Sequence, residues 1–207
     1  MIETTNGVQS LVLDEDSFDD NIKFDFGEEN TLYTKANFET IQDKVTTIMA
    51  LANNEQIRNE LLKSNEEFAS ATDSKTLIDQ REAEWLRNPK TITPFMDSLM
   101  NNEAALIAKA LIEHDKEHII PIESIMITNA YGVNAIITEK TLDYKQSDEK
   151  WWGKAKKLGE YLMTGSGSED SGGSQYKGEV ILAINDGEGN FIGIIKAVVN
   201  LDKVLLS

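Results

Sequence analysis

The sequence has no cysteine, and only two histidines and three prolines among its 207 residues. Without cysteine the chain has no disulfide scaffold, no thiol nucleophile, and no cysteine-ligated zinc or iron–sulfur cluster. Basic residues are also scarce, with 20 Lys and Arg against 36 Asp and Glu, which gives a formal net charge of −16. This deficit argues against a nucleic-acid partner and against docking on anionic lipid, because both need a basic surface.

Long hydrophobic runs are absent as well. The longest, around residues 179–184 and 191–199, are the size of strands, whereas a membrane-spanning helix needs about 20 apolar residues. Residues 1–7 have neither a basic region nor an apolar core, so no signal peptide is visible. The sequence as given therefore predicts a soluble chain.

The negative charge is concentrated at the start of the chain. Residues 1–30 contain nine acidic residues and one basic residue, which is half of the net charge. The regular spacing of their apolar residues favours a partly ordered arm with one short extended piece, and the composition fits a flexible acidic leader equally well. We expect an acidic N-terminal arm (1–30) and one domain (31–207), which consists of a helical part (31–120) and a sheet part (121–207).

Residues 31–70 show the apolar spacing of a long amphipathic helix. Steps of 3, 4, 3 and 4 place one stripe on a single face. The stripe consists of Phe38, Ile41, Val45, Ile48 and Ala52. Despite a register slip near residues 53–54, the absence of internal proline and glycine predicts one helix of about 40 residues, roughly 60 Å long. Such a helix suggests a stalk, a lever or a dimer seam, although the stripe could instead cover a sheet.

Two shorter helices should follow, at residues 77–86 and from residue 94 to a point before Pro121. After Pro121 the apolar period becomes that of strands. We expect two hairpins and one inserted helix, at residues 124–128 with 133–138, 179–185 with 191–200, and 151–158. The predicted fold class is α+β, with a long N-terminal helix and two shorter helices packed on an antiparallel sheet of about five strands.

One short motif suggests metal chemistry. His114, Glu117 and His118 form H-x-x-E-H, the inverted zinc-protease pattern, in which two histidines one helical turn apart face one metal. A zinc hydrolase also needs a third protein ligand and a buried, open site. The motif lies at the end of a helix among charged residues, where exposed helix ends produce such strings easily. Both interpretations are tested below.

The most unusual segment is residues 142–152. It contains Tyr144, Trp151 and Trp152, and three acidic residues. Adjacent tryptophans on a helix point about 100° apart, so one can anchor the helix to the sheet while the other, with Tyr144, lines a cleft. Aromatic walls suit a small ligand, and with nearby carboxylates they suit a cation. The simpler alternative is that these aromatic residues only pack the core.

An ordered set of segments resembles the Cache family of extracytoplasmic PAS-like sensor domains. The matching segments are residues 125–132 (IMITNAYG), 143–152 (DYKQSDEKWW), 156–159 (KKLG), 179–186 and 189–201. The resemblance implies a single Cache module, with a five-stranded sheet and a ligand held between the sheet and the Tyr144–Trp152 segment. It also implies a long N-terminal helix that often dimerises. Such domains lie between two membrane spans of sensor kinases, chemoreceptors or cyclase-type proteins, so we expect an extracytoplasmic piece cut between two spans.

The resemblance also bears on the ligand. The amino-acid-sensing branch has an Arg two residues before the first aromatic of the tryptophan pair and an Asp in the last strand, where this chain has Glu149 and Val198. These differences favour a cationic or neutral ligand over an amino acid. Lys196 would supply positive charge if it points inward. The ligand-binding residues that we expect are Tyr144, Trp151, Trp152, Glu149, Thr128 and Lys196.

The sequence thus predicts a non-enzymatic sensor domain with no cofactor, no catalytic residues and no metal. Its expected partners are a small molecule, a second copy through the long N-terminal helix, and flanking transmembrane helices. We expect ligand binding to shift that helix and pass the change to the membrane spans. The alternatives are a ligand-free structural or partner-binding extracellular module, and the zinc hydrolase.

Overall fold

The fold is α+β. The computed structural model describes residues 10–12, 35–166 and 176–205, with side chains placed over residues 40–159 and 177–204. The helices are α1 (Lys35–Ala52), α2 (Glu55–Ser70), α3 (Ser74–Arg87), α4 (Pro94–Met100), α5 (Glu103–Asp115), α6 (Lys150–Leu158) and α7 (Asp202–Leu205). The strands are β1 (Ser10–Val12), β2 (Ile122–Asn129), β3 (Asn134–Ile137), β4 (Glu160–Ser166), β5 (Tyr176–Asn185) and β6 (Phe191–Asn200).

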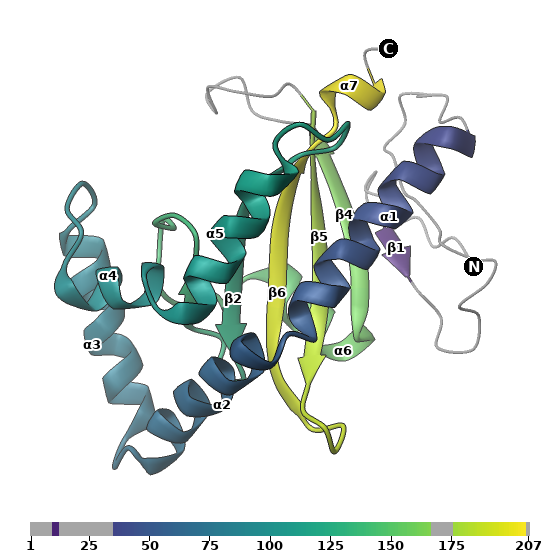
Figure 1. The fold of residues 1–207 in the computed structure, drawn as a ribbon. Coiled ribbons are helices and arrows are strands. Elements are labelled where there is room, and N and C mark those ends of the chain that lie inside the picture. Colours follow the sequence, from purple (N-terminus) through teal and green to yellow (C-terminus); the bar gives the residue numbers. More distant parts are fainter. Residues whose placement is uncertain (1–9, 13–34, 167–175, 206–207) are drawn as a thin grey trace.

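The strands form one antiparallel sheet in the order β1-β4-β5-β6-β2-β3. Its two faces are covered differently: α1, α2 and α5 lie on one face, and α6 lies on the other (Figure 1). Because side chains alternate along a strand, neighbouring residues serve different faces. On β6, for example, Ile195 packs in the main core beneath α1, α2 and α5, whereas Ile194 packs against α6.

The predicted hairpins are confirmed, since β2 with β3 and β5 with β6 pair as expected. The inserted helix is also confirmed as α6, which ends at Gly159 with a φ of 82°. The strand β4 was not predicted. The strand β1 comes from the acidic arm and pairs with β4; the rest of that arm lies outside the described residues, and the domain boundary at residue 30 stays a prediction.

The expected 40-residue helix is wrong. The helix stops at Ala52, and Asn54 caps a second helix by accepting from the backbone N–H of Gln56 (2.9 Å) and of Ile57 (3.4 Å). An asparagine side chain can accept from the backbone N–H groups that have no partner in the first turn of a new helix, so the chain can change direction there. In Figure 1, α2 runs at an angle to α1.

The apolar stripe of α1 covers the sheet. Ile41, Val45 and Ile48 are at most 4% exposed and belong to the main core with strands β2, β5 and β6. These side chains are therefore not available as a dimer seam, and the homodimer stays a prediction from the family resemblance alone. The side chain of Phe38 lies outside the described residues.

The helix predicted from residue 94 to before Pro121 is also wrong, because it is two helices. The first, α4, begins with Thr93 as cap and Pro94 in its first turn, as expected. Asn102 then caps α5 by accepting from the N–H of Ala105 at 2.7 Å. Five helices, not three, therefore precede β2 within the described residues.

Helices α3 and α4 extend beyond the β3 edge of the sheet (Figure 1). They enclose a second apolar cluster that joins α2, α3, α4 and the segment after β3. Its buried members are Phe68, Trp85, Met96, Val133, Ile137 and Tyr144. This cluster fixes the floor of the site described below. Across the described residues, no helix is both long and apolar enough to cross a membrane.

Candidate functional site

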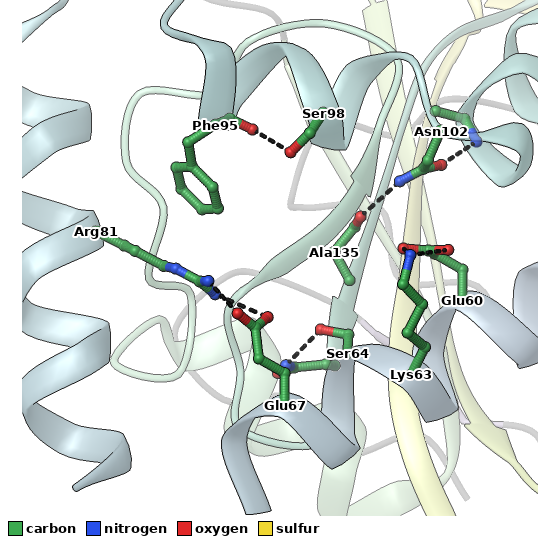
Figure 2. Close-up of polar contacts among 11 residues, drawn as sticks. Glu60, Lys63, Ser64, Glu67, Arg81, Phe95, Ser98, Asn102 and Ala135 are labelled. Carbon is green, nitrogen blue, oxygen red and sulfur yellow. Dashed lines mark hydrogen bonds and ion pairs between the residues drawn. The ribbon is translucent and has the colours of Figure 1, made fainter. Parts of the chain in front are cut away.

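A cavity of about 640 Å³ lies between α2, α3, α4 and β3. Most of the residues that line it are polar or charged. Glu60, Lys63, Ser64 and Glu67 come from α2, Arg81 from α3, and Asp97 and Ser98 from α4. Phe95, Asn134, Ala135 and Tyr144 add apolar and buried polar surface. Figure 2 shows how side chains from these separate elements face one another around the cavity.

Arg81 is the central cation of this cavity. Its guanidinium forms a bidentate ion pair with Glu67 across the gap between α3 and α2, as Figure 2 shows. The same group stacks over the ring of Phe95, 4.7 Å from the centroid, and lies 5.3 Å from the centroid of Phe68. Burial alone would lower the pKa of Arg81, but hydrogen bonds to Glu67 and Tyr144 outweigh it and raise that pKa. Arg81 therefore keeps its positive charge, and that charge is paired with Glu67.

Tyr144 forms the aromatic wall beneath Arg81. It is only 1% exposed, and its ring centroid lies 5.7 Å from that of Trp85 and 5.3 Å from that of Phe95. Burial raises the pKa of the Tyr144 hydroxyl to about 12, although Arg81 opposes this. The phenol therefore stays protonated at neutral pH. Its oxygen accepts a long contact of 3.4 Å from Arg81, which leaves its O–H without a partner among the described residues.

The segment of Tyr144 is held by backbone bonds on both sides. The N–H groups of Tyr144 and Lys145 both donate to one oxygen of Glu82, each at 2.9 Å. The carbonyl of Tyr144 accepts from the N–H of Asn134 at 3.0 Å, so the segment runs along the outer edge of β3. The position of the hydroxyl thus depends on α3 and on the sheet together.

Among the described residues that line the cavity, Asn134 carries the one buried side-chain atom that makes no hydrogen bond at all. Its side chain is 1% exposed, and Nδ2 donates to the hydroxyl of Thr141 at 2.8 Å and to the carbonyl of Asp143 at 3.0 Å. Because a carbonyl can only accept, the amide orientation is fixed. The oxygen Oδ1 then has no partner. An unsatisfied buried acceptor costs about 1–3 kcal/mol, so its presence beside a cavity calls for an explanation.

The other charged side chains of the lining also have partners within the chain. Lys63 lies 3.3 Å from Glu60 on the same helix, and Asp97 accepts from the side chain of Asn101 at 2.8 Å. In all, three carboxylates face two cations around the cavity. The arrangement can hold a polar molecule, and it contains no unpaired positive charge that would attract an anion.

Of the six residues expected to bind the ligand, only Tyr144 lines this cavity. Trp151 and Trp152 are buried against the other face of the sheet, with Ile181 and Ile194. The indole N–H of Trp152 donates to the buried hydroxyl of Thr128 at 2.9 Å. The structure therefore brings the tryptophans and Thr128 together but separates them from Tyr144.

Lys196 and Glu149 also lie away from the cavity. Lys196 points to the α6 face of the sheet, 4.9 Å from the ring centroid of Trp151, and pairs with Glu179 at 2.7 Å. Glu149 precedes α6, is exposed, and makes no side-chain capping bond. The positive charge of Lys196 is therefore taken up within the chain.

Sequence reasoning missed Arg81, Glu67, Phe95 and Asn134 as site residues. The only local signal is rarity, because Arg81 is one of three arginines in the chain. Nothing in the spacing along the chain indicates that α2, α3, α4 and β3 meet at one cavity.

The H-x-x-E-H motif does not assemble a metal site. His114 and His118 do lie near each other at the end of α5, with ring centroids 5.9 Å apart. However, Nδ1 of His118 is bound to Asp115 at 2.8 Å, and both imidazoles are exposed. Within residues 40–159 and 177–204 no group of three His, Asp or Glu is placed to hold a metal. The third ligand that a zinc hydrolase requires is thus missing from the described part.

No family model and no curated protein matches the chain. Among solved structures, it is similar to the sensory domain of the Campylobacter jejuni chemoreceptor Tlp3 (CcmL) with isoleucine bound, at 15% identity, 81% coverage of this chain and a TM-score of 0.33. The Tlp3 ligand-binding domain in complex with 4-methylisoleucine matches at 14% identity, 83% coverage and a TM-score of 0.34. An RNA-binding Light-Oxygen-Voltage receptor matches at 11% identity over 95% of this chain and 73% of its own, with a TM-score of 0.31.

The chain spans 63% and 62% of the two Tlp3 domains. At these TM-scores the likenesses are too distant to carry an argument about this chain, so its function has to be argued from the cavity itself.

Proposed function

We propose that this chain is the ligand-binding sensor domain of a receptor, and that it binds a small polar molecule in the cavity between α2, α3, α4 and β3. The observation that carries the proposal is the unpaired Oδ1 of Asn134 in the wall of a cavity of about 640 Å³. That volume is within the range of about 300–1,000 Å³ that is usual for small-molecule sites. A mixed wall of aromatic rings and fixed polar groups is also typical of such sites.

Signalling follows from what the cavity touches. Its α2 wall continues through the Asn53–Asn54 break into α1, which covers the sheet. Its Tyr144 wall continues within a few residues into α6 on the opposite face. A ligand that shifts α2 or Tyr144 would thus change the packing of α1 and α6 on the two faces of the sheet. The extracytoplasmic, membrane-anchored setting and the single Cache module belong to this proposal through the sequence resemblance.

The test is a thermal-shift screen of a broad metabolite library against three proteins. Ser98 and Ser70 are both exposed and each donates to the carbonyl three residues earlier, but only Ser98 lines the cavity. S98W should block the cavity, and S70W is the matched control. A true ligand at 100 times its Kd stabilises the fold by about 2.7 kcal/mol, which raises Tm by about 5–10 °C.

The stabilisation should vanish in S98W and persist in S70W. If no compound stabilises the wild-type protein, or if hits stabilise S98W equally, the cavity is not a ligand site. The chain is then better described as a ligand-free structural or partner-binding module.

A further inference from the structure

The groups of the cavity wall that remain free to bind are a neutral acceptor and a neutral donor. The acceptor is Oδ1 of Asn134, and the donor is the O–H of Tyr144, which stays protonated because burial raises its pKa. The two residues are joined directly, since the N–H of Asn134 donates to the carbonyl of Tyr144. A free acceptor and a free donor on two neighbouring residues match a hydroxyl-bearing ligand, because each hydroxyl offers both a donor and an acceptor.

The charged groups around Asn134 and Tyr144 disfavour both anionic and cationic ligands. An anion that approached Arg81 would also meet Glu67, its bidentate partner, and would have to displace it. A cation that approached the Tyr144 hydroxyl would meet the guanidinium of Arg81, which already contacts that hydroxyl at 3.4 Å. Burying a charge without a partner is far more costly than burying a hydrogen-bonded neutral group. Only an uncharged ligand avoids both penalties.

We propose that the cavity selects uncharged, hydroxyl-rich molecules of the sugar or polyol class, held by Oδ1 of Asn134 and the hydroxyl of Tyr144. This inference rests on the proposed function and narrows its small polar ligand to an uncharged one. Oδ1 is itself covered by neighbouring atoms, so the wall must shift to admit a ligand hydroxyl. A hydrogen bond from the ligand to Oδ1 offsets the cost of burying that oxygen without a partner, and this stabilises the shifted conformation of the wall. Ligand entry and a change of wall conformation are thereby linked.

The test uses sets of compounds that differ mainly in charge. Glucose, glucosamine and glucuronate share a ring but are neutral, cationic and anionic at pH 7; galactose, galactosamine and galacturonate form a second set, and ribose and myo-inositol extend the neutral class. Binding is measured by titration calorimetry to the wild type and to S98W and S70W. We expect at least one neutral member to bind, with its charged counterparts at least tenfold weaker, and with binding lost in S98W only.

Two point variants then test the two contacts. Y144F removes one hydroxyl and should weaken binding of the neutral compound about three- to tenfold, as expected for one neutral hydrogen bond. Y131F is the matched control, because Tyr131 packs against the same cluster but does not line the cavity. N134L keeps a similar side-chain volume but removes the Oδ1 acceptor, so it should abolish binding in a protein that still unfolds cooperatively.

The outcomes separate the two claims. If charged members bind as well as neutral ones or better, and S98W blocks them, the neutral class is wrong while the sensor site stands. If Y144F binds the neutral compound as tightly as Y131F, the proposed contact is wrong. If nothing in this panel or in the metabolite library binds, both the ligand class and the proposed function fail.

Discussion

A buried ion pair joins three elements, and its removal should have a large and non-additive effect on stability. Nζ of Lys44 on α1 pairs with Asp115 at the end of α5, and both side chains are less than a tenth exposed. The other oxygen of Asp115 accepts from the backbone N–H of Ile122, where β2 begins, at 2.7 Å. Nδ1 of His118 lies 2.8 Å from Oδ1 of Asp115 and is hydrogen-bonded to it. One carboxylate thus connects α1, α5 and the first residue of β2.

Removing one partner leaves the other charge buried and unpaired, which costs about 3–5 kcal/mol. We therefore expect K44M and D115N each to lower the free energy of unfolding by about that amount in urea titrations at pH 7. The double variant K44M/D115N buries no charge, and the new amide oxygen can still accept from Ile122. It should lose only about 1–2 kcal/mol, mainly the charge-assisted part of that bond. K75M, which breaks an exposed pair with Asp79, should leave the urea midpoint unchanged.

The pH dependence gives a second readout. Burial alone would raise the pKa of Asp115, but hydrogen bonds from Lys44, Ile122 and His118 outweigh it and lower that pKa below 3.8. A depressed folded-state pKa means that the unfolded state binds the proton more readily, so this stabilisation is complete above about pH 4 and is lost as the pH falls through the folded-state pKa. The wild type should thus lose more stability than D115N between pH 5 and pH 3. If the single losses simply add in the double variant, or if the two pH profiles run parallel, the pair is not coupled and the reasoning is refuted.

Three further predictions concern the backbone and the tryptophan face. Gly132 has a φ of 74°, and a Cβ there would lie 2.4 Å from Cβ of Ser147, so G132A should lower the free energy of unfolding by about 1–3 kcal/mol in chemical denaturation. G153A, at an exposed position of α6 with open space around it, should instead raise the free energy of unfolding by about 0.5–1 kcal/mol. N54A should cost about 1 kcal/mol by removing the α2 cap, and an unchanged Tm would contradict that role. W152F keeps an aromatic ring but removes the indole N–H that donates to Thr128 of β2, and should cost about 1–2 kcal/mol, measured by urea titration. An equal loss in W151F would point to packing instead.

The two hairpins of the sheet could be predicted from the sequence because their signals are local. Alternating apolar residues and turn residues mark β2 with β3 and β5 with β6, and the register follows from the side that each side chain must bury. The two helix errors share one cause. Both breaks fall at an Asn-Asn pair, 53–54 and 101–102, where the second asparagine caps the next helix. Apolar spacing continues across such a break, so periodicity alone joins the two helices.

The site could not be predicted in the same way. The segment around Tyr144 was found because aromatic residues are dense there, but density does not show which surface each ring reaches. Tyr144 precedes α6 and turns toward α3 and α4, whereas Trp151 and Trp152 belong to α6 and pack on the sheet. The partners of Tyr144 come from helices more than 45 residues earlier, and Arg81 and Phe95 have no pattern of their own in the sequence. Only the tertiary fold brings them to one wall.

The separation of Tyr144 from the tryptophans changes how the predicted segment would work. Instead of enclosing a ligand between itself and the sheet, the segment joins two packed regions. At one end Glu82 and Asn134 fix the backbone of Tyr144 beside the cavity. At the other end Trp152 is bound to Thr128 on the opposite face of the sheet. The N–H of Gln146 donates to the carbonyl of Gly132 at 2.7 Å between them, so the segment is braced against the β2–β3 turn along its length. A displacement at Tyr144 would therefore be passed to α6 over a few bonded residues, and no longer pathway through the core is needed to connect the cavity with the far face of the sheet.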